Sequence, residues 1–247
     1  MELKFGLATP SKLWSLGWEQ RQQAVNTIVE SGFDHIFMAD HVSFRDGSGT
    51  DGFVEVASLS QLNPSVGVMI SIYLLPLRHP LPVARQLASM ARIAPGRMIF
   101  GVGIGYREVE FNAFGMSQKD RGKRTDENLI AIKRLWNEES VCMQGTHFEL
   151  KDAVCWPKPI QKPNPPIWIG ANADIALKRA AEHGDCWYIN PHTTIETLIK
   201  QVEIYKGLLD KIGKPFPQEF PMRREAFVAK TKEEAMRLAG PFVAKKY

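Results

Sequence analysis

One pattern recurs along this chain and restricts the folds open to it: a short apolar run that ends abruptly in polar or glycine residues. It is clearest at 34–41, Asp-His-Ile-Phe-Met-Ala-Asp-His, where the apolar run is followed by Asp40 and His41. The same switch follows four other apolar runs, which end at Ile70, Phe100, Ile169 and Tyr188. In a closed ring of parallel strands the carboxyl ends meet at one mouth, where such barrels place their chemistry. We therefore expect these polar tips to converge.

Segments with helical periodicity separate the apolar runs. Residues 81–94 carry apolar side chains at i, i+3, i+4 and i+7, and 18–31 and 194–212 show comparable stripes. Strict alternation of strands and helices predicts parallel βαβ units. The length of 247 residues is that of one (β/α) barrel. The sequence therefore predicts an α/β fold, a TIM (β/α)8 barrel, formed by a single domain over residues 1–247.

The pattern departs from a regular barrel in two places. Residues 141–166 are expected to form an insertion, first a hairpin around Gln144-Gly145-Thr146 and then a proline-rich extended crossover. The predicted strands are 3–8, 34–39, 66–72, 97–101, 167–169, 186–189 and 225–229. An eighth strand is missing, which would leave an exposed strand edge. We expect either a chain truncated at its carboxyl terminus or a shortened barrel whose gap a partner covers.

Composition argues against several classes of protein. The net charge of +4 is mild and the basic residues are scattered, so a nucleic-acid partner is not expected. The three cysteines show no Cys-x-x-Cys spacing, and no apolar run approaches the roughly 18 residues of a membrane span. The chain begins without a basic leader, so we predict a cytoplasmic protein that does not bind membranes. The histidines show no metal-ligand spacing and Gly-x-Ser-x-Gly is absent, which favours an organic cofactor.

Three sites carry candidate chemistry, each with a purely structural alternative. His41 at a strand tip is a candidate acid–base group, or it only hydrogen-bonds Asp40 or a loop. The glycines of 101–105 either let the chain turn at the rim or let a flat cofactor lie against the backbone. Asn172, in the segment 170–174, either caps the following helix or belongs to a phosphate cradle at its start.

Several motifs, taken in order, resemble the luciferase-like flavin monooxygenase superfamily. They are 34–41, Leu-Leu-Pro-Leu-Arg-His-Pro at 74–80, Gly96-Arg97 with 101–105, Arg124-x-x-Glu127, Ile-Trp-Ile-Gly at 167–170, and Arg179-Ala-Ala with Gly184-Asp185. The resemblance spans almost the whole chain. It implies a (β/α)8 barrel that holds FMN, or the related deazaflavin coenzyme F-420, at its carboxyl-end mouth.

The resemblance also implies roles for particular residues. His41 matches the active-site histidine beside the flavin ring, and Met69-Ile70 falls where the family has a non-prolyl cis peptide that supports this ring. Ala171 stands where many relatives have a second glycine. The implied cofactor-binding residues are Asp40, Met69, Ile70, Ser71, Gly103, Ile104, Gly105, Gly170, Ala171 and Asn172. Phe44, Tyr106 and Trp187 are candidate walls of the substrate pocket, with core or rim packing as the alternative for each.

The function that follows is a flavin-dependent oxidoreductase. The first reading is a monooxygenase that receives reduced FMN from a separate flavin reductase, lays it against the bulge at 69–71, and transfers one oxygen atom of O2 to a small organic substrate. His41 would be the acid–base group of this reaction. The alternatives are hydride transfer to or from the deazaflavin and a non-catalytic flavin-binding relative. The family further implies a homodimer packed through the first three helices, 18–31, 53–62 and 81–94.

Overall fold

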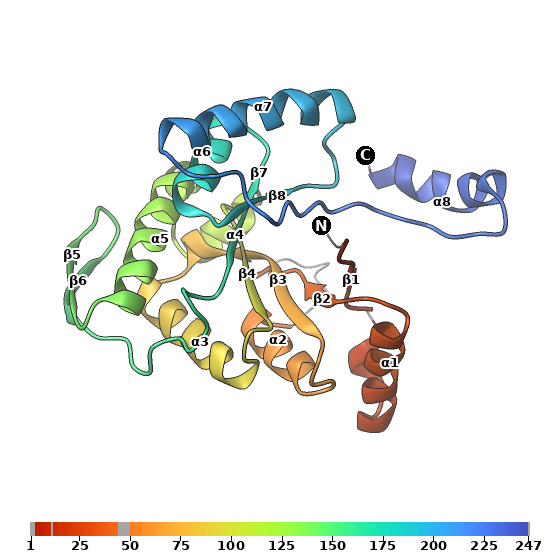
Figure 1. The fold of residues 1–247 in the computed structure, drawn as a ribbon, viewed down its shortest axis with the longest axis horizontal. Coiled ribbons are helices and arrows are strands. Elements are labelled where there is room, and N and C mark those ends of the chain that lie inside the picture. The colour runs from red at the N-terminus through yellow and green to blue at the C-terminus, as the bar shows by residue number, and fades with distance from the viewer. Residues whose placement is uncertain (1–2, 11, 44–49, 247) are drawn as a thin grey trace.

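The computed structural model describes residues 3–10, 12–43 and 50–246. Six parallel strands form one curled sheet in the order β1-β2-β3-β4-β7-β8, with helices packed on its outer face (Figure 1). The strands of this sheet are β1 Gly6–Ala8, β2 His35–Met38, β3 Gly67–Leu74, β4 Met98–Gly103, β7 Ile167–Ala171 and β8 Cys186–Ile189. The predicted parallel α/β fold is therefore confirmed, as a half-barrel.

Helices alternate with these strands and leave a helical layer outside the sheet. The α-helices are α1 Trp18–Glu30, α2 Gly52–Ser60, α3 Pro80–Ile93, α4 Glu108–Ala113, α5 Arg121–Asn137, α6 Asp174–His183, α7 Ile195–Lys211 and α8 Lys232–Lys246. Short 3-10 helices are η1 Leu13–Ser15, η2 Leu75–Leu77 and η3 Gln118–Asp120. The main hydrophobic core lies between this layer and the sheet, and it includes Ile36, Ile70, Phe100 and Trp187.

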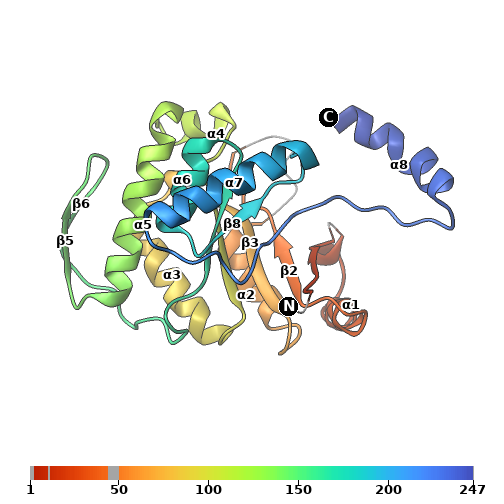
Figure 2. The same ribbon diagram turned by 45° about the horizontal axis from the view of Figure 1, so that its top comes forward.

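An antiparallel hairpin, β5 Val141–Gln144 and β6 Glu149–Ala153, projects beyond α5 (Figure 2). Glu127 of α5 fastens its turn: the carboxylate accepts hydrogen bonds from the backbone N–H of Thr146 at 3.0 Å and from Nδ1 of His147 at 2.9 Å. The proline-rich segment that follows leads into β7 and contains two cis X-Pro bonds, at Trp156-Pro157 and Lys162-Pro163.

The seventh strand is not where the sequence predicted it. Residues 225–229 have no strand structure, and Phe227 and Val228 are exposed. The chain instead joins the sheet earlier, through a single parallel bridge between Ile189 and Met222. Phe227 and Val228 favour extended chain, but a strand also needs a neighbouring edge to pair with. Among the described residues the parallel sheet has six strands, so it contains neither the predicted seventh strand nor an eighth barrel strand.

Helix α8 stands apart from the rest of the molecule, at the end of an extended segment that leaves the sheet beside β8 (Figures 1 and 2). Met236 and Phe242 on this helix are exposed. An ion pair of 3.1 Å between Lys4 Nζ and Glu219 Oε1 joins the extended segment to the residues just before β1. The open side of the half-barrel therefore lies between β1 and this segment.

The strand β3 bends inward at its middle. Its register against β4 shifts between Ile70 and Tyr73, and the non-prolyl cis peptide joins Ser71 to Ile72. The family resemblance placed this peptide at Met69-Ile70, which was wrong by two residues, because the irregularity of β3 falls between Ile70 and Tyr73. The side chain of Ile72 consequently lies against Gly103 and Gly170. A Cβ atom added to Gly103 would come 2.9 Å from Ile72 Cδ1, and one added to Gly170 would come 2.8 Å from it.

Close backbone packing beside this bulge gives a stability prediction. A Cβ added at Gly101 would overlap the carbonyl oxygen of Ile70, whereas one added at Gly207, inside α7, would meet nothing within 4 Å. We expect Gly101→Ala to lower the free energy of unfolding by about 1–3 kcal/mol, as overpacked core variants do. Gly207→Ala should raise it by about 0.5–1 kcal/mol, since alanine favours the helix. Urea denaturation of both variants measures the two signs, and equal effects would contradict the prediction.

Candidate functional site

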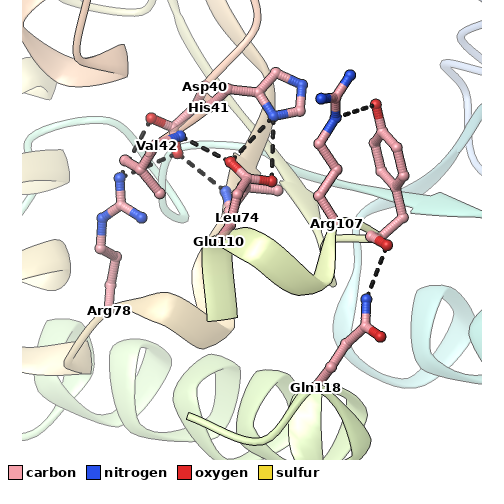
Figure 3. A network of polar contacts seen from close by, with 9 residues as sticks. Asp40, His41, Val42, Leu74, Arg78, Arg107, Glu110 and Gln118 are labelled. Atoms are coloured by element: carbon pink, nitrogen blue, oxygen red, sulfur yellow. Dashed lines mark hydrogen bonds and ion pairs between the residues drawn. The ribbon is translucent and has the colours of Figure 1, made fainter. Parts of the chain in front are cut away.

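His41 and a buried carboxylate form a pair beyond the carboxyl end of β2 (Figure 3). Nδ1 of His41 lies 3.2 Å from Oε1 and 3.4 Å from Oε2 of Glu110, and the Glu110 side chain is fully buried while that of His41 is 27% exposed. Oε1 also accepts a hydrogen bond of 2.8 Å from the backbone N–H of Val42. The carboxylate therefore holds both the ring and the backbone that carries it. A carboxylate on one ring nitrogen fixes the tautomer and orientation of an imidazole.

Sequence reasoning missed Glu110, because no periodic pattern marks the six-residue helix α4 that carries it. The local geometry depends on Gly105, which has a positive φ of 72° and whose Cβ would come 3.0 Å from the ring of Phe111. The chain can therefore turn back sharply after β4 and place α4 beneath His41. For Gly105 this supports the turn-forming interpretation of the 101–105 glycines. Ile104, just before it, is partly exposed.

Asp40 is buried directly beside this pair and faces the helical layer. Its carboxylate accepts hydrogen bonds from the backbone N–H of Leu74 at 3.2 Å and from Nη2 of Arg78, 3.3 Å from each oxygen (Figure 3). Burial raises the pKa of Asp40, and the Arg78 guanidinium acts in the opposite direction. The sequence predicted that Asp40 contacts the cofactor. The structure places it as a support that joins the end of β2 to the end of β3.

The rim beside His41 is aromatic. The rings of His41 and Tyr106 meet edge to face with centroids 6.1 Å apart, and Tyr106 is 69% exposed. Two residues hold this tyrosine: Gln118 Nε2 donates to its carbonyl oxygen at 2.8 Å, and Arg107 Nε donates to its hydroxyl at 3.2 Å. The structure thus brings the predicted residues His41 and Tyr106 together. The third predicted rim residue, Phe44, lies outside the described residues.

The inner face of the sheet carries a second, smaller apolar cluster. It contains Met69, Ile99 and Tyr188, with Phe37 and Trp168 packed against them. Above Met69, the Ser71 hydroxyl donates a hydrogen bond of 2.9 Å to the Tyr188 hydroxyl. Of the predicted bulge residues, Met69 and Ser71 therefore belong to the barrel interior. The side chain of Ile70 does not, since it is fully buried in the main core on the helical side.

Asn172 follows β7 at the same end of the sheet. The predicted cap was wrong: the N-cap of α6 is Ala173, without a side-chain hydrogen bond, because the Asn172 amide is engaged elsewhere. Its Oδ1 accepts from the side chain of Asn190 after β8, and its carbonyl accepts 2.9 Å from Nε2 of Gln201. The loop is thereby fixed while the first backbone N–H groups of α6 keep no side-chain acceptor. Such a helix start favours anions.

The remaining predicted residues line the sheet itself. Gly170 faces the interior against Ile72, whereas Ala171 is buried in the main core. Trp187 is also fully buried there, where its Nε1 donates 3.0 Å to the carbonyl of Ala171 and its ring packs on Tyr205. Trp187 therefore takes the core-packing role that was the alternative to a pocket wall.

The interior fits a planar aromatic cofactor. Gly103 and Gly170 carry no side chains, so Ile72 lies flat against β4 and β7 and stays partly exposed. This apolar surface, the His41–Glu110 pair and the start of α6 stand at the carboxyl ends of neighbouring strands.

A separate cavity of about 390 Å³ opens at the other end of β7 and β8, beside Lys133, Trp168 and Asp185. Among the described residues no three His, Cys, Asp or Glu side chains are grouped to hold a metal. None of the described helices has the length and apolarity of a membrane span.

Comparison with known proteins places these features in context. A family model described as luciferase-like monooxygenase matches residues 5–247. The oxygenase component of flavin-dependent trigonelline monooxygenase from Acinetobacter baylyi is 25% identical over 83% of this chain and 57% of its own length. The FMNH(2)-dependent dimethylsulfone monooxygenase of Pseudomonas putida is 27% identical over 94% and 64%, respectively. The F420-dependent glucose-6-phosphate dehydrogenase of Microbacterium testaceum is 31% identical over 61% and 46%.

The chain thus spans less than two thirds of the length of each of these three relatives. Among solved structures, the monooxygenase RslO1 from Streptomyces bottropensis superposes with a TM-score of 0.83 at 24% identity, covering 98% of this chain and 77% of that one. The oxygenating constituent of 3,6-diketocamphane monooxygenase from Pseudomonas putida, in complex with FMN, superposes with a TM-score of 0.79 at 17% identity, covering 100% and 75%. These likenesses support the fold.

Proposed function

Because the chain belongs to the luciferase-like monooxygenase family, we propose that it is a flavin-dependent oxidoreductase that uses reduced FMN and O2 to oxygenate a small organic substrate. The observation that carries this proposal is the His41–Glu110 pair, with 3.2 Å between Nδ1 and Oε1, at the same end of the sheet as the apolar surface of Ile72. The two monooxygenase relatives also align with a larger share of this chain than the dehydrogenase does, 83% and 94% against 61%.

Some residues of this chain would bind the cofactor, and others would transfer a proton. Ile72, with Gly103 and Gly170 behind it, would support the flat ring, and the start of α6 beside Asn172 would receive the phosphate. Bound reduced flavin supplies the electrons that activate O2. His41, held by Glu110, would exchange a proton with the substrate or cofactor. Tyr106 would shield this proton transfer from water on the rim side.

Hydride transfer with the deazaflavin F-420 is the second candidate. It is favoured by one observation, the 31% identity to an F420-dependent dehydrogenase over 157 residues. The apolar surface of Ile72 suits either ring. A non-catalytic flavin-binding relative remains the third alternative and differs from both in the absence of turnover.

We further propose a separate flavin reductase as partner, as the printed description of the trigonelline relative as an oxygenase component suggests. A homodimer through α1, α2 and α3 is proposed from the apolar residues that these helices leave exposed, Trp18, Val54 and Ile93. Sedimentation of the purified chain would test the dimer.

Cofactor titration followed by a product screen tests the function. We expect FMN to bind the 247-residue chain with micromolar affinity and F-420 more weakly, as followed by fluorescence. Chemically reduced FMN with O2 should then yield an oxygenated product from one member of a panel of small organic substrates. Tighter binding of F-420 together with anaerobic hydride transfer would select the second candidate. Flavin binding without any product would select the third, and failure of both cofactors to bind would refute the proposal.

A further inference from the structure

Arg223 enters the interior of the half-barrel from its open side. The chain is held against the end of β8 by two backbone hydrogen bonds of 3.0 Å, from Ile189 N–H to the Pro221 carbonyl and from Arg223 N–H to the Ile189 carbonyl. Since the side chains of consecutive residues in extended chain alternate, Met222 is 44% exposed while Arg223 turns inward. Its guanidinium carbon lies 5.4 Å from the centre of the Phe37 ring on β2.

The surroundings of this guanidinium belong to the inner face of the sheet. Phe37 packs on the cluster of Met69, Ile99 and Tyr188, and the Tyr188 hydroxyl accepts from Ser71. Burial raises the pKa of Tyr188, while the Ser71 hydrogen bond and the Arg223 charge oppose that rise. One cation, two hydroxyls and the Phe37 ring thus lie together on the inner face of the sheet.

No carboxylate in residues 3–10, 12–43 or 50–246 forms an ion pair with Arg223. The next residue behaves differently. The Arg224 guanidinium donates hydrogen bonds to backbone carbonyl oxygens of the loop after β8, from Nη1 to Asn190 at 2.8 Å and from Nη2 to Thr193 at 3.3 Å. A partly buried guanidinium keeps its charge at all ordinary pH values and pairs best with a planar or tetrahedral oxyanion.

We propose that Arg223 is a specificity-determining residue that binds the anionic group, a carboxylate or sulfonate, of the organic substrate. The substrate anion would lie against Phe37, with the Tyr188 hydroxyl, which accepts from Ser71, as a further donor, and the rest of the molecule would extend toward His41. The term substrate rests on the function proposed above, whereas the binding of the anion does not.

Direct binding to the chain without flavin tests the proposal. The probes are methanesulfonate and acetate, with dimethyl sulfone and acetamide as neutral counterparts of similar shape, titrated by ligand-observed NMR. We expect the anions to bind in the millimolar range and Arg223→Met to weaken them about 10- to 100-fold without affecting the neutral probes, because a charged hydrogen bond is lost. Arg223→Lys should retain part of the affinity, and Arg224→Met should leave it within about twofold.

Three results would overturn the proposal: no anion binding by the parent chain, equal weakening of anionic and neutral probes by Arg223→Met, or a loss of FMN affinity in place of anion affinity. The last would make Arg223 a cofactor contact. FMN titration of the same proteins keeps the two proposals apart, since anion binding can fail where flavin binding succeeds, and the reverse. With an active anionic substrate, Arg223→Met should raise KM and leave kcat nearly unchanged.

Discussion

Replacing Glu110 with glutamine is expected to lower turnover by about 100-fold or more while flavin binding and folding persist, since this is the range that acid–base groups contribute. Glutamine keeps an oxygen that can accept the 2.8 Å hydrogen bond from Val42, so the loop should hold its place. The negative charge beside Nδ1 of His41 is lost, however, and the amide can present N–H where the carboxylate accepted. Glu110 therefore acts as a positioning residue, through His41.

The measurement combines kinetics with the state of the imidazole. The effect should appear in kcat with little change in KM, and 15N spectra of labelled histidine should show an altered tautomer for His41. Glu108→Gln is the matched control, because Glu108 lies on the same helix and is exposed. Unchanged spectra with unchanged kcat in Glu110→Gln would show that the pair serves only packing.

Removal of Asp40 is expected to have the largest effect on stability. Asp40→Ala should lower the free energy of unfolding by about 3–5 kcal/mol, because the Arg78 guanidinium and the Leu74 N–H lose their buried acceptor. Asp40→Asn should cost less, about 1–2 kcal/mol, since it keeps one acceptor oxygen and the raised pKa of Asp40 shows that burial already opposes its charge. Urea denaturation gives both values.

The pH dependence separates charge from hydrogen bonding at Asp40. A raised pKa in the folded state means that this group's stabilising contribution is present below the ordinary aspartate pKa and is lost as the pH rises through the raised value. The stability gap between the parent and Asp40→Asn should therefore narrow with rising pH. A gap that widens, or an Asn variant as unstable as the Ala variant, would show that the ion pair with Arg78 outweighs burial.

The sequence predicted those elements whose signals are local. The bounds of β8 agree with the prediction, and those of α1 and α7 lie within one residue of it at each end, because an apolar run or a helical stripe marks these elements locally. The strand expected at 225–229 failed because pairing with a neighbour decides whether extended chain becomes a strand. The parallel sheet itself followed from alternation alone.

The site was predictable only in part, for a similar reason. His41 stands out at its strand tip, whereas its partner Glu110 lies 69 residues away on a helix with no periodic pattern. The cis peptide at Ser71-Ile72 and the engagement of Asn172 by Asn190 depend on neighbouring strands that no local pattern reports. Long-range contacts thus decide what each polar residue at the strand ends touches.

The strand β1 has a consequence for the behaviour of the chain at high concentration. It stands at the edge of the sheet with β2 as its only partner among the described strands, and it is three residues long. An unpaired edge can template the growth of intermolecular sheets, but a foreign strand would gain too few backbone hydrogen bonds along Gly6–Ala8 to offset its lost freedom. The shortness of β1 thus opposes amyloid-like assembly at this edge.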